Sequence, residues 1–174
     1  KEIKVDKPPP KYFTPEEIEK IYNSVKNPLL LSTYKAIEVT GMRGGELRNS
    51  FRDGLFVKIF KCKSRSERVV PIPVDYVADY DSAKDANYSD SWITHSFTRY
   101  VKKCNIDGHK TLHSLRHTYG YRKLLELNNI QLVRDLLGHS SVSVTEKYTR
   151  IRTDYLKQVF TERLNNQSNQ YAYG

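Results

Sequence analysis

The stretch that organises the chain reads LLGHSSVSVTEKYTR, from Leu136 to Arg150. Gly138 is the residue type that most often ends a helix, and His139 follows it directly. Tyr148 lies nine positions after His139, with basic residues close on both sides. A tyrosine hydroxyl ionises near pH ~10, so it is a poor nucleophile unless positive charges surround it. The groups that the rest of the chain supplies therefore decide whether Tyr148 is a nucleophile.

Apolar residues recur at helical spacing over most of the chain. The sequence TPEE at Thr14 offers a capping threonine, a proline at the first helical position and a glutamate that closes a capping box. This first helix is interrupted at Pro28, and a second helix ends at Gly41. Further helices are predicted over residues 45–50, 75–87, 93–104, 112–128, 130–137, 142–152 and 153–164.

The period of the apolar residues changes after Gly54. They alternate over residues 55–60, and a second β-rich run covers residues 68–73. The polar segment between the two runs predicts an antiparallel hairpin with a basic tip. The tip residues are Lys61, Lys63, Arg65 and Arg68. The predicted fold class is therefore mainly α, with a small antiparallel β-hairpin or sheet.

Basic residues lie along the whole chain and not in a tail. Lys and Arg number 29 against 20 Asp and Glu, which gives a formal net charge of +9. A basic globular surface favours a polyanionic partner, and nucleic acid is the most common one. Many basic domains are merely soluble, so the charge alone does not decide between these interpretations.

The two cysteines, Cys62 and Cys104, form no CxxC motif and have only each other as a partner. Neither a disulfide framework nor a thiolate metal site is expected, which favours a reducing compartment. No apolar run approaches the ~20 residues of a membrane span, and no signal peptide is present. We therefore expect a soluble protein of the cytoplasm, without a membrane as partner.

The ends of the chain differ in composition from its middle. Residues 1–11 hold four lysines and three consecutive prolines, which favour an extended polyproline II path and indicate a linker. Residues 165–174 are rich in Asn and Gln and poor in apolar side chains, which predicts a flexible tail. One folded domain is therefore expected over residues 12–164.

A first cationic motif, GMRGGEL, begins at Gly41 and centres on Arg43. Glycines on both sides allow a backbone or a ligand to come close, and Glu46 can hold the guanidinium from three positions away. A solvated Arg–Glu pair on a short helix explains these residues equally well.

A second motif, HSLRH, begins at His113. His113 and Arg116 are three positions apart and therefore share one face of the predicted helix. A capping histidine beside an exposed arginine is the alternative. His113 and His117 have the spacing of a zinc pair, but Ser114 stands where the HExxH motif requires glutamate. No other ligands are clustered, so no metal is expected.

Together, these groups match the requirements of phosphoryl transfer. Two arginines can clamp the non-bridging oxygens of a phosphate, and a histidine can orient that group or handle a proton near neutral pH. A lysine on the hairpin can protonate a leaving oxygen, while a tyrosine attacks in line. The cations supply the electrostatic stabilisation, so neither ATP nor another cofactor is expected.

Three motifs resemble the tyrosine recombinase (phage integrase) family, in the family's order and near its spacing. They are GMRGGEL at Gly41, HSLRHT at His113, and LLGHSS through TEKYT between Leu136 and Thr149. The similarity extends from about Tyr12 to about Leu164. The resemblance implies the fold of the family's catalytic domain. It also implies cutting and rejoining of DNA through a 3′-phosphotyrosyl intermediate, without high-energy cofactors.

The resemblance assigns roles to the residues around the scissile phosphate. Arg43 and Arg116 would be the two arginines that clamp it. Glu46 matches the acidic residue that supports the first arginine. His113 matches the histidine that precedes the second arginine by three positions and would accept a proton.

The resemblance also implies the nucleophile and the general acid. His139 matches the histidine that bonds the phosphate, and Tyr148 matches the nucleophile. Aligning residues 67–71 with the second strand of the family's hairpin puts Lys63 at the position of the catalytic lysine. A slip of two residues would put Lys61 there instead. Both lysines stay open, because the segment that precedes them is shorter than usual.

The expected partner is double-stranded DNA, on which the family assembles as a tetramer. Residues 1–11 would then be the severed linker from an N-terminal DNA-binding domain. The implied use is the integration or excision of a viral or mobile genome.

Two other functions remain open. A type IB topoisomerase-like relaxation of DNA would use the same residues. Alternatively, the helices at 130–137 and 142–151 resemble a helix-turn-helix, which would read a major groove without chemistry. This second interpretation leaves Arg43, His113 and the hairpin lysine without a shared purpose.

Overall fold

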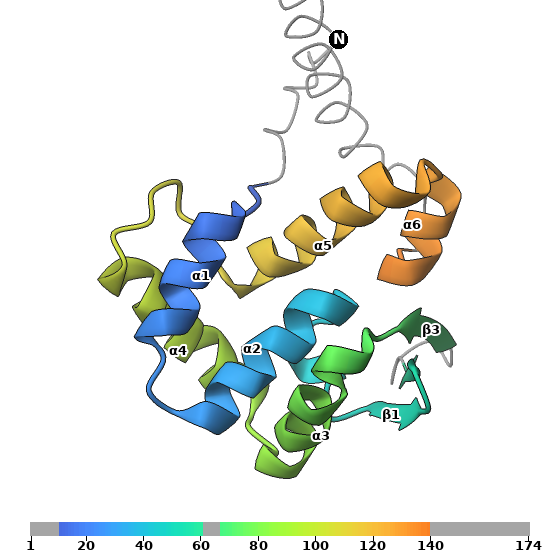
Figure 1. Cartoon of the computed structure of the whole chain (residues 1–174), viewed down its shortest axis with the longest axis horizontal. Helices are drawn as coiled ribbons and strands as arrows, with labels where there is room; N and C mark the ends of the chain where they lie inside the picture. Colours follow the sequence, from blue (N-terminus) through green and yellow to red (C-terminus); the bar gives the residue numbers. More distant parts are fainter. Residues whose placement is uncertain (1–10, 61–66, 140–174) are drawn as a thin grey trace, which may run out of the picture.

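The structure, a computed structural model, describes residues 11–60 and 67–139. Its helices are α1 (Pro15–Ser24), α2 (Pro28–Thr40), α3 (Val77–Ala86), α4 (Asp90–Lys103), α5 (Leu112–Leu127) and α6 (Ile130–Leu137), with the 3-10 turns η1 (Gly44–Glu46) and η2 (Val74–Tyr76). Its strands are β1 (Ser50–Asp53), β2 (Phe56–Phe60) and β3 (Glu67–Pro71). The predicted fold class, mainly α with a small antiparallel sheet, is confirmed (Figure 1).

The sequence signals at the ends of the first two helices act as predicted. Thr14 Oγ1 accepts a hydrogen bond from the amide of Glu17, whose carboxylate accepts one from the amide of Thr14. Asn27 caps the start of α2, and Gly41 ends it in the left-handed conformation at φ +62°. A Cβ at Gly41 would lie 2.3 Å from the ring of Tyr119. Glycine is therefore required there both for its backbone conformation and for close packing.

The sheet has three antiparallel strands in the order β1-β2-β3, one more than a hairpin. The predicted helix over residues 45–50 is wrong, because η1 ends at Glu46 and Ser50 already begins a strand. Asp53 pairs with Phe56 across a two-residue loop. The first loop residue is a glycine with φ +58°. A glycine at this place is typical of a tight hairpin. The turn that it forms therefore determines the structure here, and the helical pattern of residues 45–50 does not.

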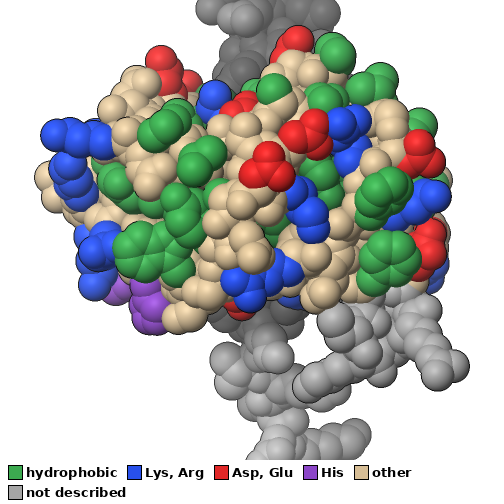
Figure 2. All heavy atoms as spheres, turned by 90° about the horizontal axis from the view of Figure 1, so that it is seen from below, with side chains coloured by type: hydrophobic (Ala, Val, Ile, Leu, Met, Phe, Trp, Pro, Cys, Tyr) green, Lys and Arg blue, Asp and Glu red, His purple; other side chains and the backbone are tan. Residues whose placement is uncertain are grey.

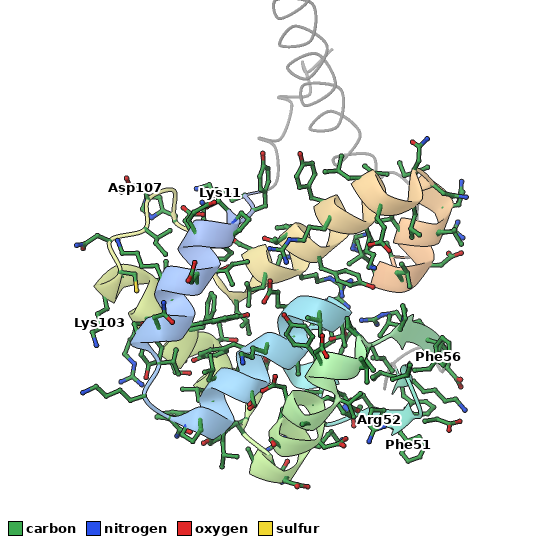
Figure 3. The ribbon with its side chains drawn as sticks, in the orientation of Figure 1. Lys11, Phe51, Arg52, Phe56, Lys103 and Asp107 are labelled. Atoms are coloured by element: carbon green, nitrogen blue, oxygen red, sulfur yellow. The ribbon has the colours of Figure 1, made fainter. Side chains whose placement is uncertain are left out.

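The sheet packs on the core with one face only. Val57, Ile59 and Val70 point inward and are fully buried. Phe51 and Phe56 lie on the opposite face, are exposed, and point away from the body of the molecule (Figure 3). This alternation is the one that a half-buried sheet requires.

The main hydrophobic core lies between α1, α2, α4 and the inner face of the sheet. Fully buried Tyr34 packs edge-on against Phe97 at 4.9 Å between ring centroids, and its hydroxyl shares a hydrogen bond of 2.7 Å with Ser96. A smaller cluster consists of Tyr119, Leu124, Val133 and Leu137. It joins α5 to α6, while α5 also packs against α2. Helix α5 thus lies between α2, which belongs to the main core, and α6, which belongs to the smaller cluster.

The chain enters the domain against α5. The amide of Phe13 donates a hydrogen bond of 2.9 Å to Thr118 Oγ1, and the Phe13 side chain is buried. The ring of Tyr12 stacks on that of Tyr121 at 4.7 Å between centroids and an interplanar angle of 23°. Two consecutive residues therefore fix the start of the domain to this helix.

Several predicted segments lie outside the described residues. They are the linker up to residue 10, the hairpin tip at 61–66, the helices at 142–152 and 153–164, and the tail at 165–174. Among the helices that the structure describes, none combines the length and the apolar character needed to cross a bilayer. On the face shown in Figure 2, charged side chains of both signs lie between the hydrophobic ones.

Candidate active site

A cleft of about 220 Å³ lies where the loop after α2 meets the first turns of α4 and α5. Its lining comprises Met42, Arg43, Gly44, Asp90, Thr94, Thr111, Leu112, His113 and Arg116. Two motifs that are far apart in the sequence therefore meet at one cleft. The structure brings together Arg43, His113 and Arg116 there.

Arg43 lies in the loop that leaves α2. Its Nη1 donates a hydrogen bond of 2.8 Å to Glu46 Oε1, and its amide donates one of 2.8 Å to Glu46 Oε2. These two bonds orient the Arg43 side chain relative to Glu46, and 45% of the Arg43 side chain remains exposed. Arg43 is therefore held by one partner and still accessible from the cleft.

Arg116 has the opposite environment, because its side chain is only 2% exposed. Its Nη1 donates a hydrogen bond of 2.6 Å to the carbonyl of Gly41, and its Nη2 donates one to the carbonyl of Leu137. A buried cation is costly unless such partners satisfy it. The alternative of an exposed arginine on α5 is thus wrong, and the guanidinium ties together the ends of α2 and α6.

Glu46 connects three arginines. Its carboxylate accepts hydrogen bonds from Arg43 and Arg68 and lies 3.7 Å from Nη1 of Arg116. Burial alone would raise the pKa of Glu46. Hydrogen bonds from the Arg68 side chain and the Arg43 amide, with the charges of Arg68 and Arg116, lower it to about 2 instead. Three cations thus share one carboxylate, and the excess of positive charge suits an anionic ligand.

His113 lies in the first turn of α5, on the wall of the cleft. Its ring contacts that of His117 edge-on at 4.6 Å between centroids. Burial lowers the pKa of His113, and the charges of Arg116 and Arg43 lower it further. At neutral pH its imidazole is therefore uncharged and has a nitrogen that can accept a proton.

His139 follows Gly138, which ends α6 in the left-handed conformation at φ +60°. Its amide donates a hydrogen bond of 3.1 Å to the carbonyl of Arg134. The preceding turn also supplies the Leu137 carbonyl that Arg116 binds, so this arginine anchors the segment that carries His139. Burial, followed by the charges of Arg116 and other cations, lowers the pKa of His139 to about 4. This histidine is neutral near pH 7 as well.

Arg68 belongs to β3, so its predicted place at the hairpin tip is wrong. Its side chain is 7% exposed. Nε donates a hydrogen bond of 2.9 Å to the Leu136 carbonyl, while Nη1 and Nη2 donate bonds of 3.0 and 2.6 Å to the two oxygens of Glu46. The sequence does contain a signal for the burial of Arg68, because this residue shares the inward face of its strand with Val70. An inward arginine requires a buried acid.

Asp90, at the first position of α4, is a second residue that sequence reasoning missed. Its carboxylate packs against both glycines that follow Arg43. A Cβ at Gly44 would lie 2.3 Å from Asp90 Oδ1, and one at Gly45 would lie 3.5 Å from Asp90 Cγ. No sequence pattern links a residue at the start of α4 to the Arg43 loop, since only the tertiary fold brings them together.

Tyr148 and Lys63, with its alternative Lys61, lie outside the described residues. Of the predicted site residues, Arg43, His113 and Arg116 line the cleft, Glu46 contacts both of these arginines, and His139 follows the Leu137 carbonyl that Arg116 binds. Within residues 11–60 and 67–139, no three His, Cys, Asp or Glu side chains gather in a way that could hold a metal ion.

Comparison with known proteins gives a consistent result. Residues 80–154 match the model of the phage integrase family. A tyrosine recombinase of Pseudothermotoga lettingae is 29% identical over 162 residues, which cover 82% of this chain and 57% of that protein. The crystal structure of XerA recombinase is similar with a TM-score of 0.73 and 22% identity, over 91% of this chain and 66% of that one.

The catalytic domain of bacteriophage HP1 integrase is also similar, with a TM-score of 0.65 and 21% identity, over 87% of this chain and 94% of that domain. The chain spans between 57% and 64% of the length of the recombinases from Pseudothermotoga lettingae and Pyrococcus furiosus. The family model, the related recombinases and the shared fold agree. Residues 80–154 therefore match the phage integrase family, and the chain has the fold of a tyrosine recombinase catalytic domain.

Proposed function

We propose that this domain cleaves and rejoins DNA strands as a site-specific recombinase, through a covalent 3′-phosphotyrosyl intermediate. The observation that carries the proposal is the meeting of Arg43, His113 and Arg116 at one cleft, with Glu46 behind them. Guanidinium groups suit the non-bridging oxygens of a phosphodiester, because their N–H groups match its geometry. Charge that develops on those oxygens during the reaction is then stabilised by groups already in place.

In the proposed reaction, the hydroxyl of Tyr148 attacks the phosphorus atom, and the bond from phosphorus to the 5′ oxygen breaks. His113 accepts the tyrosine proton, a role that its lowered pKa allows near neutral pH. Lys63 or Lys61 protonates the leaving 5′ oxygen, and the reverse steps rejoin the strand. The roles of Tyr148 and of the lysines rest on the family resemblance.

His139 has a different proposed role. With its pKa lowered to about 4, its imidazole is neutral near pH 7 and donates one N–H. We assign that N–H to a non-bridging oxygen of the phosphate. A neutral donor binds the oxygen without adding a further charge beside Arg116.

The proposed partner is double-stranded DNA, and the whole protein is proposed to act on it as a tetramer. Solved structures with a similar fold include XerH recombinase bound to its difH substrate and a lambda integrase tetramer bound to a Holliday junction. Because an integrase of bacteriophage HP1 shares the fold, integration or excision of a viral or mobile genome is the proposed use. The proposed location is the cytoplasm, where such DNA is reached.

The two alternative functions make different demands on the site. A non-catalytic helix-turn-helix module has no use for a cleft lined by Arg116, whose side chain is only 2% exposed and lies 3.7 Å from Glu46. A relaxation enzyme would use the same groups as a recombinase. Formation of a Holliday junction between two duplexes separates these two activities, because relaxation of one duplex forms none.

The test of the proposal is a covalent adduct on Tyr148. Duplexes selected for binding from a random-sequence pool are nicked near the bound site, so that the cleaved end diffuses away. The wild type should form a slowly migrating, protease-sensitive adduct, and Tyr148→Phe should form none. Tyr155→Phe is the matched control, because this tyrosine also lies among charged residues and should keep the adduct. No adduct with the wild type, or an undiminished one with Tyr148→Phe, would contradict the proposal.

A further inference from the structure

The guanidinium of Arg68 joins three elements that meet behind the cleft. From β3 it reaches the Glu46 carboxylate on η1 through two hydrogen bonds of 3.0 and 2.6 Å. Its third donor, Nε, binds the Leu136 carbonyl at the end of α6 over 2.9 Å. Arg68 does not line the cleft, and its three nitrogens already donate to protein oxygens, so it is not placed to bind a DNA phosphate itself.

Each of the groups that Arg68 holds is next to a candidate catalytic residue. Glu46 in turn binds the amide and the guanidinium of Arg43. The Leu136 carbonyl lies three residues before His139, in the last turn of α6. Strand β3, which carries Arg68, directly follows residues 61–66, where both candidate lysines lie. One side chain is thus linked to the Arg43 loop and to the end of α6 that leads to His139.

We propose that Arg68 is a positioning residue of the active site, which aligns Arg43 through Glu46 and fixes the end of α6 that leads to His139. This inference rests on the proposed recombinase function and assigns a role that none of the expected site residues fills. Arg68 does not touch the substrate. It determines where the groups that do so are held.

An arginine is required for this role because three donors must meet three acceptors at fixed angles. A lysine ammonium at the same place would keep the charge but lose the planar fork. The packing is equally tight, since a Cβ on Gly138 would lie 2.9 Å from Arg68 Cδ and 3.1 Å from its Nη1. The glycine that ends α6 therefore also makes room for the Arg68 side chain.

Without Arg68, each oxygen of Glu46 loses one hydrogen bond. Arg116, with Nη1 already 3.7 Å from Glu46 Oε2, is the nearest replacement. The carboxylate would then draw Arg116 away from the carbonyls of Gly41 and Leu137. Arg43, which depends on the same carboxylate, would move with it. A misplacement of about 1 Å at a reacting centre costs on the order of 10²-fold in rate.

The experiment measures single-turnover cleavage of the nicked duplex and DNA affinity for Arg68→Met and Arg68→Lys. Arg68→Met should lower the cleavage rate by on the order of 10²-fold. Arg68→Lys preserves the charge and is the milder change for folding. Its cleavage rate should lie between those of Arg68→Met and the wild type. DNA affinity should stay within about two-fold of the wild type, because the three Arg68 nitrogens bind protein oxygens and make no phosphate contact. A parallel loss of affinity and cleavage would contradict a positioning role.

Arg52→Met is the matched control. Arg52 makes the same kind of fork on β1, with Nε and Nη2 2.9 and 2.6 Å from the two oxygens of Asp81, but it faces α3 (Figure 3). Its replacement removes a forked but more exposed ion pair from the same sheet and should leave the cleavage rate of the folded protein unchanged. An equal loss in Arg52→Met and Arg68→Met would show that only the stability of the sheet matters, and would overturn the proposal.

A double-mutant cycle with Glu46→Gln tests the route through Glu46. If Arg68 acts through this carboxylate, the combined variant should lose no more activity than the more damaged single variant. Independent, additive losses would overturn the inference. If the wild type and Arg52→Met form the tyrosine adduct and Arg68→Met forms it equally fast, the positioning role fails while the proposed function stands. If the wild type forms none, both fail.

Discussion

The two arginines of the cleft occupy contrasting environments. Arg116 belongs to a buried wall, in which its 2% exposed side chain is held by backbone carbonyls and by nearby Glu46. Arg43 belongs to an open wall, together with Asp90, and 45% of its side chain is exposed. The buried wall is therefore part of the folded framework, whereas the open wall is a surface that a ligand can reach.

The two arginines should therefore differ in how much they contribute to folding and to the reaction. The ends of α2 and α6 depend on Arg116 for a hydrogen-bond donor, so its removal disturbs the fold as well as the site. Within the described residues, the hydrogen bonds that Arg43 donates go to Glu46, and Glu46 has Arg68 as a second partner. Replacement of Arg43 should therefore disturb the site alone. The predictions below test this contrast, from the largest expected effect to the smallest.

Arg116→Met should lower both stability and activity. It leaves the carbonyls of Gly41 and Leu137 without their guanidinium donor, and loss of one member of a buried ionic group costs about 3–5 kcal/mol. Cleavage should fall by at least ~10²-fold, as for a lost transition-state donor. Urea unfolding and single-turnover cleavage measure the two effects. A stability loss below about 1 kcal/mol would remove the distinction between the walls.

Arg43→Met should reduce cleavage by ~10²–10³-fold, since it removes a donor for the developing charge. Its free energy of unfolding should change by no more than about 1 kcal/mol, because a partly exposed ion pair contributes little to stability. Arg48→Met is the control for charge, since Arg48 is exposed, lies one turn further along and binds the carbonyl of Asn87. A cleavage rate reduced equally in Arg48→Met would indicate a general effect of charge on DNA binding.

Gly44→Ala should produce a moderate effect confined to the open wall. The new Cβ would lie 2.3 Å from Asp90 Oδ1, so the carboxylate must move, at a cost of about 1–3 kcal/mol for overpacking. Asp90→Ala in the same protein should relieve the contact and restore most of the stability. Thermal unfolding of the single and double variants measures this. A double variant as unstable as Gly44→Ala alone would show that another contact, such as Leu112, is limiting.

The pKa of His139 should depend on Arg116 in the buried wall and on Arg43 in the open wall. Burial, followed by the charges of these two arginines, lowers this pKa from 6.5 to about 4. Because the unfolded chain binds this proton below about 6.5 and the folded one only below about 4, the contribution of His139 to stability is lost as the pH falls through that window. Arg43→Met should raise the midpoint, which an NMR titration of the imidazole would detect. An unchanged midpoint would mean that Arg43 is too well screened to act on His139.

The sequence predicts the parts of this site that depend on local pattern. Capping at Thr14, the glycine ends at Gly41 and Gly138, and the shared helical face of His113 and Arg116 are all properties of a few neighbouring residues. Each of them is found in the structure. Helical spacing indicates that two side chains share a face, but not whether another element covers that face. The burial of Arg116 is therefore beyond such a pattern.

The residues that were missed depend on contacts between distant segments. The sequence pattern places Arg68 at the start of the second β-rich run and among the basic residues of the hairpin tip. Its partners, Glu46 and Leu136, lie on other elements. Asp90 has no motif of its own and is recognised only by its packing against the Arg43 loop. Local propensity also missed β1, since its pairing with β2 is decided by the turn at Gly54.

The entry of the chain against α5 has a mechanical consequence. Phe13 and Tyr12 grip this helix at Thr118 and Tyr121, within two turns of Arg116. Helix α5 also carries His113 and Arg116, so the start of the described chain and one wall of the cleft are held by the same helix. A displacement of Tyr12 would reach this helix first through the stacked tyrosine rings.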